Sequence, residues 1–82
     1  MNISNEQLEQ QLKDCPGVEY VQVTGDGYHY HLTLVTDEFK DLSKVARQRW
    51  VYAHLNAFIT SGQLHALTMA TWTNDEWEKK RG

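Results

Sequence analysis

Two runs of alternating apolar and polar residues flank a short glycine-rich turn, and this pattern constrains the fold more than any other feature of the sequence. The runs cover residues 18–24 and 28–34, and the Gly-Asp-Gly segment 25–27 joins them. The apolar positions on one side of the two runs are Val21, Val23, Tyr30, Leu32 and Leu34. An Asp-Gly turn between alternating runs is typical of a β-hairpin, so we expect two antiparallel strands with one apolar face.

Two capping boxes mark the starts of short helices near the ends of the chain. Ser4 and Gln7 have the required spacing at the first site, and Thr73 and Glu76 have it at the second. In such a box each side chain bonds the backbone N–H of the other residue, which satisfies donors that the helix leaves free. The Pro-Gly pair at residues 16–17 is expected to end the first helix.

A longer helix is expected over residues 43–61, with Gly62 at its C-terminal cap. Its apolar residues recur at helical spacing and predict a buried stripe. The residues of this stripe are Val45, Val51, Tyr52, Leu55, Phe58 and Ile59. A third strand is expected over residues 64–72.

The expected order is therefore α-β-β-α-β-α, which defines an α+β fold with a three-stranded sheet and helices on one face. The helical crossover before the last strand allows one parallel pairing. With 82 residues the chain is expected to form a single domain, residues 1–82. A domain this small buries only about 60% of its surface, which favours a binding module over an enzyme with a deep pocket.

Composition excludes several classes of protein. No apolar run approaches the roughly 18 residues needed to span a membrane. The first residues show no basic stretch followed by an apolar stretch, so no signal peptide is expected. The chain also has one cysteine, Cys15, and we therefore expect a cytoplasmic protein. The formal net charge is −3, which argues against non-specific DNA binding.

Three histidines are candidate metal ligands, because neutral imidazole binds iron, zinc and copper. His29 and His31 are two residues apart on a predicted strand and therefore share one face. His65 lies at the start of the last predicted strand. Each also has an ordinary interpretation as a solvated or hydrogen-bonded polar residue.

The sequence contains no complete metal site, because a structural zinc centre needs four Cys or His ligands at recognisable spacing. Cys15 has no nearby histidine in the sequence to activate it as a nucleophile. The Gly-Asp-Gly segment lies inside a hairpin, so a tight turn is favoured over a phosphate-binding loop.

The start of the long helix is basic, with Lys44, Arg47 and Arg49 beside Trp50. Cations in the first turns oppose the helix dipole, which suggests a role for them in binding a partner. The alternatives are a nucleic-acid surface and a solvated helix face.

Three segments taken together resemble the BolA-like family, in particular its short bacterial branch. The first is residues 24–30, similar to that branch's Gly-Asp-Gly hairpin with a following His and aromatic residue. The second is the helical pattern of residues 39–55. The third is residues 64–67, Leu-His-Ala-Leu, followed by Thr73 and Trp77.

This resemblance implies a fold related to class II KH domains and a role without catalysis. BolA-like proteins pair with monothiol glutaredoxins and share a [2Fe-2S] cluster with them, so the isolated chain is not expected to bind the cluster. The ligands implied on this side are His65 and a second residue near the hairpin turn. We expect His29 in that position, with His31 as the fallback, and the basic helix start is expected to help dock the glutaredoxin.

The resemblance also leaves a second function open, because some BolA-like proteins regulate transcription. DNA contact would then use Lys44, Arg47 and Arg49, since the Gly-x-x-Gly loop with which KH domains clamp a nucleic-acid backbone does not occur here. The free chain is expected to be a monomer or a weak homodimer.

Overall fold

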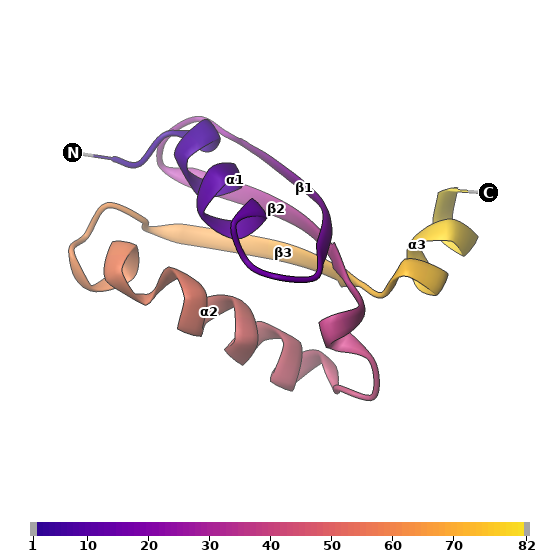
Figure 1. The fold of residues 1–82 in the computed structure, drawn as a ribbon. Helices are drawn as coiled ribbons and strands as arrows, with labels where there is room; N and C mark the ends of the chain where they lie inside the picture. Colours follow the sequence, from indigo (N-terminus) through magenta and orange to yellow (C-terminus); the bar gives the residue numbers. More distant parts are fainter. Residues whose placement is uncertain (1, 82) are drawn as a thin grey trace.

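The structure is a computed structural model, and it describes residues 2–81. Its elements follow the expected order and are shown in Figure 1. They are α1 (Asn5–Lys13), β1 (Val18–Gly25), β2 (His29–Thr36), the short 3-10 helix η1 (Asp37–Phe39), α2 (Lys44–Thr60), β3 (Ala66–Trp72) and α3 (Asn74–Arg81). The predicted α+β class and element order are confirmed.

The sheet has the order β1-β2-β3, so β2 is the central strand. β1 and β2 pair antiparallel, with Val23 opposite Leu32, as the hairpin pattern predicts. β2 and β3 pair parallel, with His29 opposite Ala66. The α2 crossover makes this parallel pairing feasible, because parallel neighbours cannot be joined by a tight turn.

The hydrophobic core lies between the sheet and the two longer helices. α1 packs on β1, and α2 runs beside β3 (Figure 1). The buried apolar side chains of the sheet are those that the alternation predicts, together with Val35 on the other face. The helices contribute Leu8, Leu12, Val51 and Leu55.

The helix ends match the capping signals. The Ser4–Gln7 box is formed in both directions. The Thr73–Glu76 box is formed as well: the Thr73 backbone N–H donates to Glu76 at 2.9 Å, and the Glu76 N–H donates to Thr73 Oγ1 at 3.2 Å. α1 ends at Lys13, a turn before the Pro-Gly pair that was expected to stop it.

The predicted apolar stripe of α2 is only half buried in the core. Val51 and Leu55 are fully buried, and Phe58 packs against them, whereas Val45, Tyr52 and Ile59 are exposed. The prediction was wrong for these three residues because a sheet of three strands presents a narrow face. α2 therefore buries one row of side chains, and the neighbouring row faces outward.

α3 lies at the end of β3 and reaches the sheet face that the longer helices leave open. Its Trp77 stacks on Tyr20 of β1, with ring centroids 5.3 Å apart. Tyr20 neighbours the core-facing Val21, so it faces away from α1 and α2. α3 thus covers one end of the open face.

Side chains bind backbone groups on both outer strands. On β1, the N–H of Val23 donates to the Glu9 carboxylate of α1 at 2.8 Å. On β3, the carbonyl of Thr71 accepts from Arg47 of α2 at 3.1 Å. Each long helix is therefore joined to the edge strand beside it by a charge-assisted hydrogen bond.

The contrast between the two rows of α2 predicts a contrast in stability. Leu55→Ala is expected to lower the free energy of unfolding by about 2–5 kcal/mol, because it leaves a cavity in the core. Ile59→Ala, one turn away on the exposed row, should cost less than about 1 kcal/mol. Urea denaturation of the two variants measures this, and equal losses would contradict the described packing.

Candidate functional site

The hairpin turn holds His29 in a fixed position. The Asp26 carboxylate accepts hydrogen bonds from the backbone N–H groups of Tyr28 and His29, each at 2.9 Å. These bonds, that from His29 first, lower the pKa of Asp26. The N–H of Asp26 in turn donates to the His29 carbonyl at 3.3 Å. Both the backbone N–H and the carbonyl of His29, the first residue of β2, are thus hydrogen-bonded to Asp26.

The loop after α2 holds His65 by anchoring the residue before it. Leu64 is buried, and its N–H donates to the Phe58 carbonyl at 3.0 Å. The loop turns at Gly62, whose φ of +80° lies in the region that glycine adopts without strain. His65 itself is exposed and lies just before β3, not within it as predicted.

The ring of Tyr28 lies close to both histidines. Its ring stacks on the His65 imidazole, with centroids 5.1 Å apart and planes 16° apart. The same ring lies 5.9 Å from the His29 imidazole. The backbone agrees with this placement, since the Ala66 N–H donates to the Tyr28 carbonyl at 3.4 Å and His29 pairs with Ala66.

The resulting site is open to solvent at one end of the sheet. His29, His65 and Tyr28 are exposed, and Tyr28 is 62% exposed. A shallow groove of about 170 Å³ adjoins them, and its lining includes His29, His31 and Thr68. A partner protein therefore has direct access to both imidazoles.

The fallback residue His31 has a different environment. It lies on the same open face of the sheet as His29, one step further along β2. Its Nδ1 is 2.9 Å from Thr68 Oγ1, so one ring nitrogen is already in a hydrogen bond. The fourth histidine, His54, is on α2, where its Nδ1 is 2.8 Å from the Trp50 carbonyl.

Two imidazoles make half of a metal site. Within residues 2–81, no three or more His, Cys, Asp or Glu side chains are grouped so as to hold a metal ion. Cys15 precedes β1, whose first residue pairs with the last residue of β2, so the thiol lies at the opposite end of the sheet from His29. Burial, and secondarily Asp14, raise the pKa of Cys15. Further ligands would have to come from another molecule.

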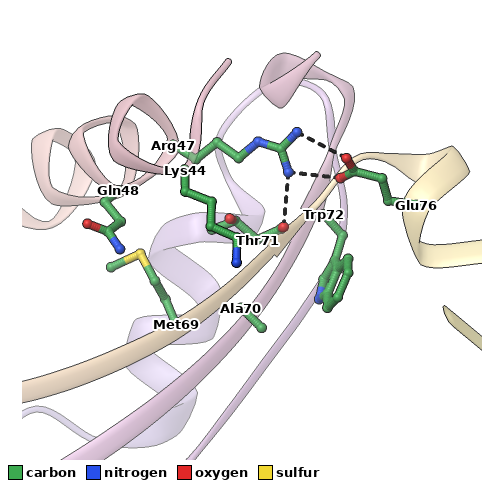
Figure 2. A pocket seen from close by; sticks show the side chains of 8 residues that line it. All are labelled: Lys44, Arg47, Gln48, Met69, Ala70, Thr71, Trp72 and Glu76. Carbon is green, nitrogen blue, oxygen red and sulfur yellow. Dashed lines mark hydrogen bonds and ion pairs between the residues drawn. The ribbon is translucent and has the colours of Figure 1, made fainter. Parts of the chain in front are cut away.

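One of the three cations at the start of α2, Arg47, is bound within the protein. Arg47 has only 12% of its side chain exposed and forms a bidentate ion pair with Glu76 of α3, with nitrogen–oxygen distances of 2.8 and 3.2 Å (Figure 2). It also donates to the carbonyls of Leu42 and Thr71, each at 3.1 Å. Arg47 therefore joins α2 to β3 and α3, and its predicted role in binding a partner stays a prediction.

Lys44 and Arg49, the other two cations of this segment, are exposed. A DNA-binding surface at this segment would have two cations in place of three, and each cation that neutralises a phosphate adds to affinity. A groove of about 340 Å³ lies beside Lys44, between α2 and β3 (Figure 2). Its lining includes Lys44, Gln48, Met69 and Glu76.

Two contributors to these contacts were not predicted. Tyr28 was noted within the hairpin motif, but nothing in the sequence shows that its ring meets His65. Glu76 was assigned only to a helix cap, yet it also binds Arg47 at a separation of 29 residues. The contact of Tyr28 with His65 depends on the parallel register of β2 and β3, and the pair of Arg47 with Glu76 depends on how α2 packs beside β3 and α3. The residue pattern specifies neither arrangement.

Comparison with known proteins identifies the family. The family model described as BolA-like protein matches residues 2–76. An uncharacterized protein from the rpoN-murA intergenic region of Acinetobacter guillouiae is 38% identical over 77 residues, covering 94% of this chain and 93% of the relative. The acid stress protein IbaG of Escherichia coli K12 is 29% identical over 79 residues, with coverages of 96% and 94%. The chain belongs to the BolA-like family.

Solved structures agree with this assignment. A bol-like protein from Babesia bovis superposes with a TM-score of 0.83 at 27% identity, covering 98% of this chain and 95% of the other. The BolA domain of SufE1 from Arabidopsis thaliana gives 0.76 at 28%, with coverages of 93% and 98%. Yeast Fra2 gives 0.77 at 26%, with coverages of 96% and 88%. No helix within the described residues is long and apolar enough to cross a membrane.

The turn that positions His29 predicts that alanine substitution will destabilise the protein more at Gly25 than at Gly62. A Cβ at Gly25 would lie 2.4 Å from the His29 carbonyl oxygen, whereas one at Gly62 would meet nothing within 4 Å. Both residues have positive φ. Gly25→Ala is therefore expected to lose about 1–3 kcal/mol more stability than Gly62→Ala. Urea denaturation measures the difference, and equal losses would rule out the collision.

The Arg47–Glu76 pair predicts a dependence of stability on pH. Hydrogen bonds from Arg47, and then from the Thr73 backbone, lower the pKa of Glu76 to about 2. Because the folded pKa lies below the unfolded value of about 4.3, this contribution is complete above about pH 5 and is lost as the pH falls toward 2. Glu76 is partly exposed, so screening leaves about 1 kcal/mol.

Glu76→Gln should therefore be less stable than the parent at pH 7, with the difference shrinking at pH 4 and nearly absent at pH 2. Guanidinium denaturation at the three pH values measures it. Glu78→Gln, on an exposed residue of the same helix, removes the same charge and serves as the control. A Glu76→Gln deficit that is constant across the three values would contradict the ion pair.

Proposed function

We propose that this protein is a non-catalytic cytoplasmic adaptor in iron–sulfur cluster assembly, trafficking or iron sensing. In this role it pairs with a monothiol glutaredoxin, and the two chains share a [2Fe-2S] cluster. His65 and His29 are the ligands from this side. Membership in the BolA-like family supports the proposal, as do structural neighbours such as Fra2 and the SufE1 BolA domain.

The observation that carries the proposal is the placement of two exposed imidazoles around one tyrosine ring. Iron–sulfur clusters accept imidazole in place of thiolate, and two histidines on one iron are known in Rieske centres. The donor set fits such a shared cluster, because two imidazoles are present and no group of three or more ligating side chains occurs within residues 2–81. The partner would supply the thiolates, since Cys15 lies at the far end of the sheet.

The local structure suits each ligand to its role. The Asp26 turn and the buried Leu64 fix the backbone on either side of the site. Because both backbone segments are already fixed, less conformational entropy is lost when the two histidines bind a ligand. When bound, the cluster supplies iron sites that accept imidazole. A neutral imidazole in place of a thiolate lowers the negative charge of the cluster and so raises its reduction potential.

The exposed position of the site agrees with transfer or sensing rather than catalysis. Two histidines on an open surface do not enclose a substrate, whereas many enzymes close the active site around the reacting groups. They do leave a bridging group accessible to a second protein.

The proposal predicts a ligand-specific change in a complex with a glutaredoxin. Mixing the protein with a [2Fe-2S]-loaded monothiol glutaredoxin should produce a new visible circular dichroism spectrum. His65→Ala and His29→Ala should each alter or abolish that spectrum, because each removes one ligand. Visible circular dichroism, with gel filtration to detect the complex, measures the outcome.

Two matched substitutions complete the experiment. His54→Ala removes an exposed imidazole on α2, away from the site, and should leave the spectrum unchanged. His31→Ala tests the fallback ligand and should also have no effect if His29 is the ligand. Absence of a complex with the parent protein would overturn the proposal, and an effect of His31 in place of His29 would reassign the second ligand.

A further inference from the structure

The outer row of α2 presents apolar side chains to solvent. Val45, Tyr52 and Ile59 are 56%, 42% and 37% exposed. They follow one another at intervals of seven residues, which is two helical turns, so they form one stripe along the helix. At 1.5 Å per residue the stripe is about 21 Å long. We refer to these three residues as the α2 stripe.

The stripe differs from the other exposed apolar side chains. Two further large hydrophobic residues are exposed in the described part of the chain, Tyr20 and Tyr28. Each of these is stacked on another ring, Trp77 and His65 respectively. Clustered apolar residues on a surface commonly mark an interaction site, whereas scattered ones do not.

The charged residues of α2 itself all have one sign. α2 contains three cations and no acidic residue, although the whole chain has a formal net charge of −3. Arg49 lies four residues after Val45 and three before Tyr52, so it borders the stripe. Lys44 and Arg49 form no ion pair within residues 2–81. The stripe therefore has a cationic border without internal partners.

A groove adjoins the stripe on the side of β3. Gln48 lies three residues after Val45 and four before Tyr52, so it occupies the same side of the helix. Gln48 also lines the groove with Lys44 and Met69 (Figure 2). The apolar stripe, the cations and the groove thus form one continuous surface.

We propose that this surface docks an amphipathic helix of a partner protein, with apolar side chains on the α2 stripe and acidic side chains against Lys44 and Arg49. The proposal is independent of the His29–His65 site. The stripe supplies one apolar residue in every heptad, which is the period with which a second helix packs in knobs-into-holes fashion. The intervals of the stripe are about 10.5 Å, whereas same-face residues of a strand recur every 6.6 Å or so.

The surface discriminates against two other occupants. A second copy of α2 would bring cations against cations, because this helix has no acidic residue to pair with them. Nucleic acid would gain from Lys44 and Arg49, but its phosphates would gain nothing from the α2 stripe. Helix-in-groove recognition uses both parts of the surface.

The test uses a designed probe and the full chain. The probe is a 21-residue synthetic helix with leucine at the first and fourth positions of each heptad and glutamate on both flanks, where like charges oppose its self-association. Its addition to 15N-labelled protein should shift the amide resonances along α2. A probe with lysine in place of glutamate should bind at least about tenfold more weakly, a difference of about 1.4 kcal/mol.

Substitutions separate the stripe from its surroundings. Tyr52→Ser with Ile59→Ser should weaken binding at least about tenfold, which corresponds to 1.4 kcal/mol. Lys44→Gln with Arg49→Gln should weaken it and remove most of its salt dependence. Ala53→Ser with Ala57→Ser changes exposed residues of the same helix off the stripe and should have no effect.

Several results would overturn the inference. These are no binding of the acidic probe, amide shifts confined to other elements, or equal losses with the Ala53 and Ala57 control. A DNA duplex that produces the same shifts with steep salt dependence would assign the surface to nucleic acid. Sedimentation showing a dimer that Tyr52→Ser dissociates would assign it to a second copy.

Discussion

The pairing of β2 with both of its neighbours is the constraint on which the rest of the structure depends. β2 joins β1 in the antiparallel hairpin and β3 in the parallel pair. Side chains of a strand point alternately to the two faces of the sheet. The observed register of β2 therefore places Tyr30, Leu32 and Leu34 on the core face and His29 and His31 on the open face. A slip of one residue in this strand would remove Tyr30, Leu32 and Leu34 from the core and bury His29 and His31.

This arrangement explains why a protein with a modest core can hold a well-defined surface site. Side chains of the core face fix β2, and the histidine site lies at the first residue of the same strand. His65 is fixed in a similar manner by Leu64, which is buried next to it. In both cases a residue inserted into the core positions an exposed neighbour, so the site needs no enclosing pocket.

Local patterns in the sequence predicted the elements well and the contacts between distant elements less well. The hairpin, both capping boxes and the Gly62 turn follow from residues near one another in the chain, and all appear in the structure. The exposure of Val45, Tyr52 and Ile59 depends on how wide a sheet α2 covers, which helical periodicity does not encode. The same limit applies to Arg47, whose partner Glu76 is on a different helix, and to the contact of Tyr28 with His65.

The two edges of the sheet have a consequence for how molecules of this protein meet at high concentration. A three-stranded sheet has two outer strands, and unpaired backbone groups on such strands invite the strands of other molecules. Glu9 and Arg47 each place a buried or partly buried charge on an outer backbone group, at Val23 and Thr71. A foreign strand would have to displace a charge-assisted bond at either edge. The same side chains that attach the helices to the sheet thus oppose growth into a continuous sheet, and the chain's open surfaces remain available for side-chain recognition.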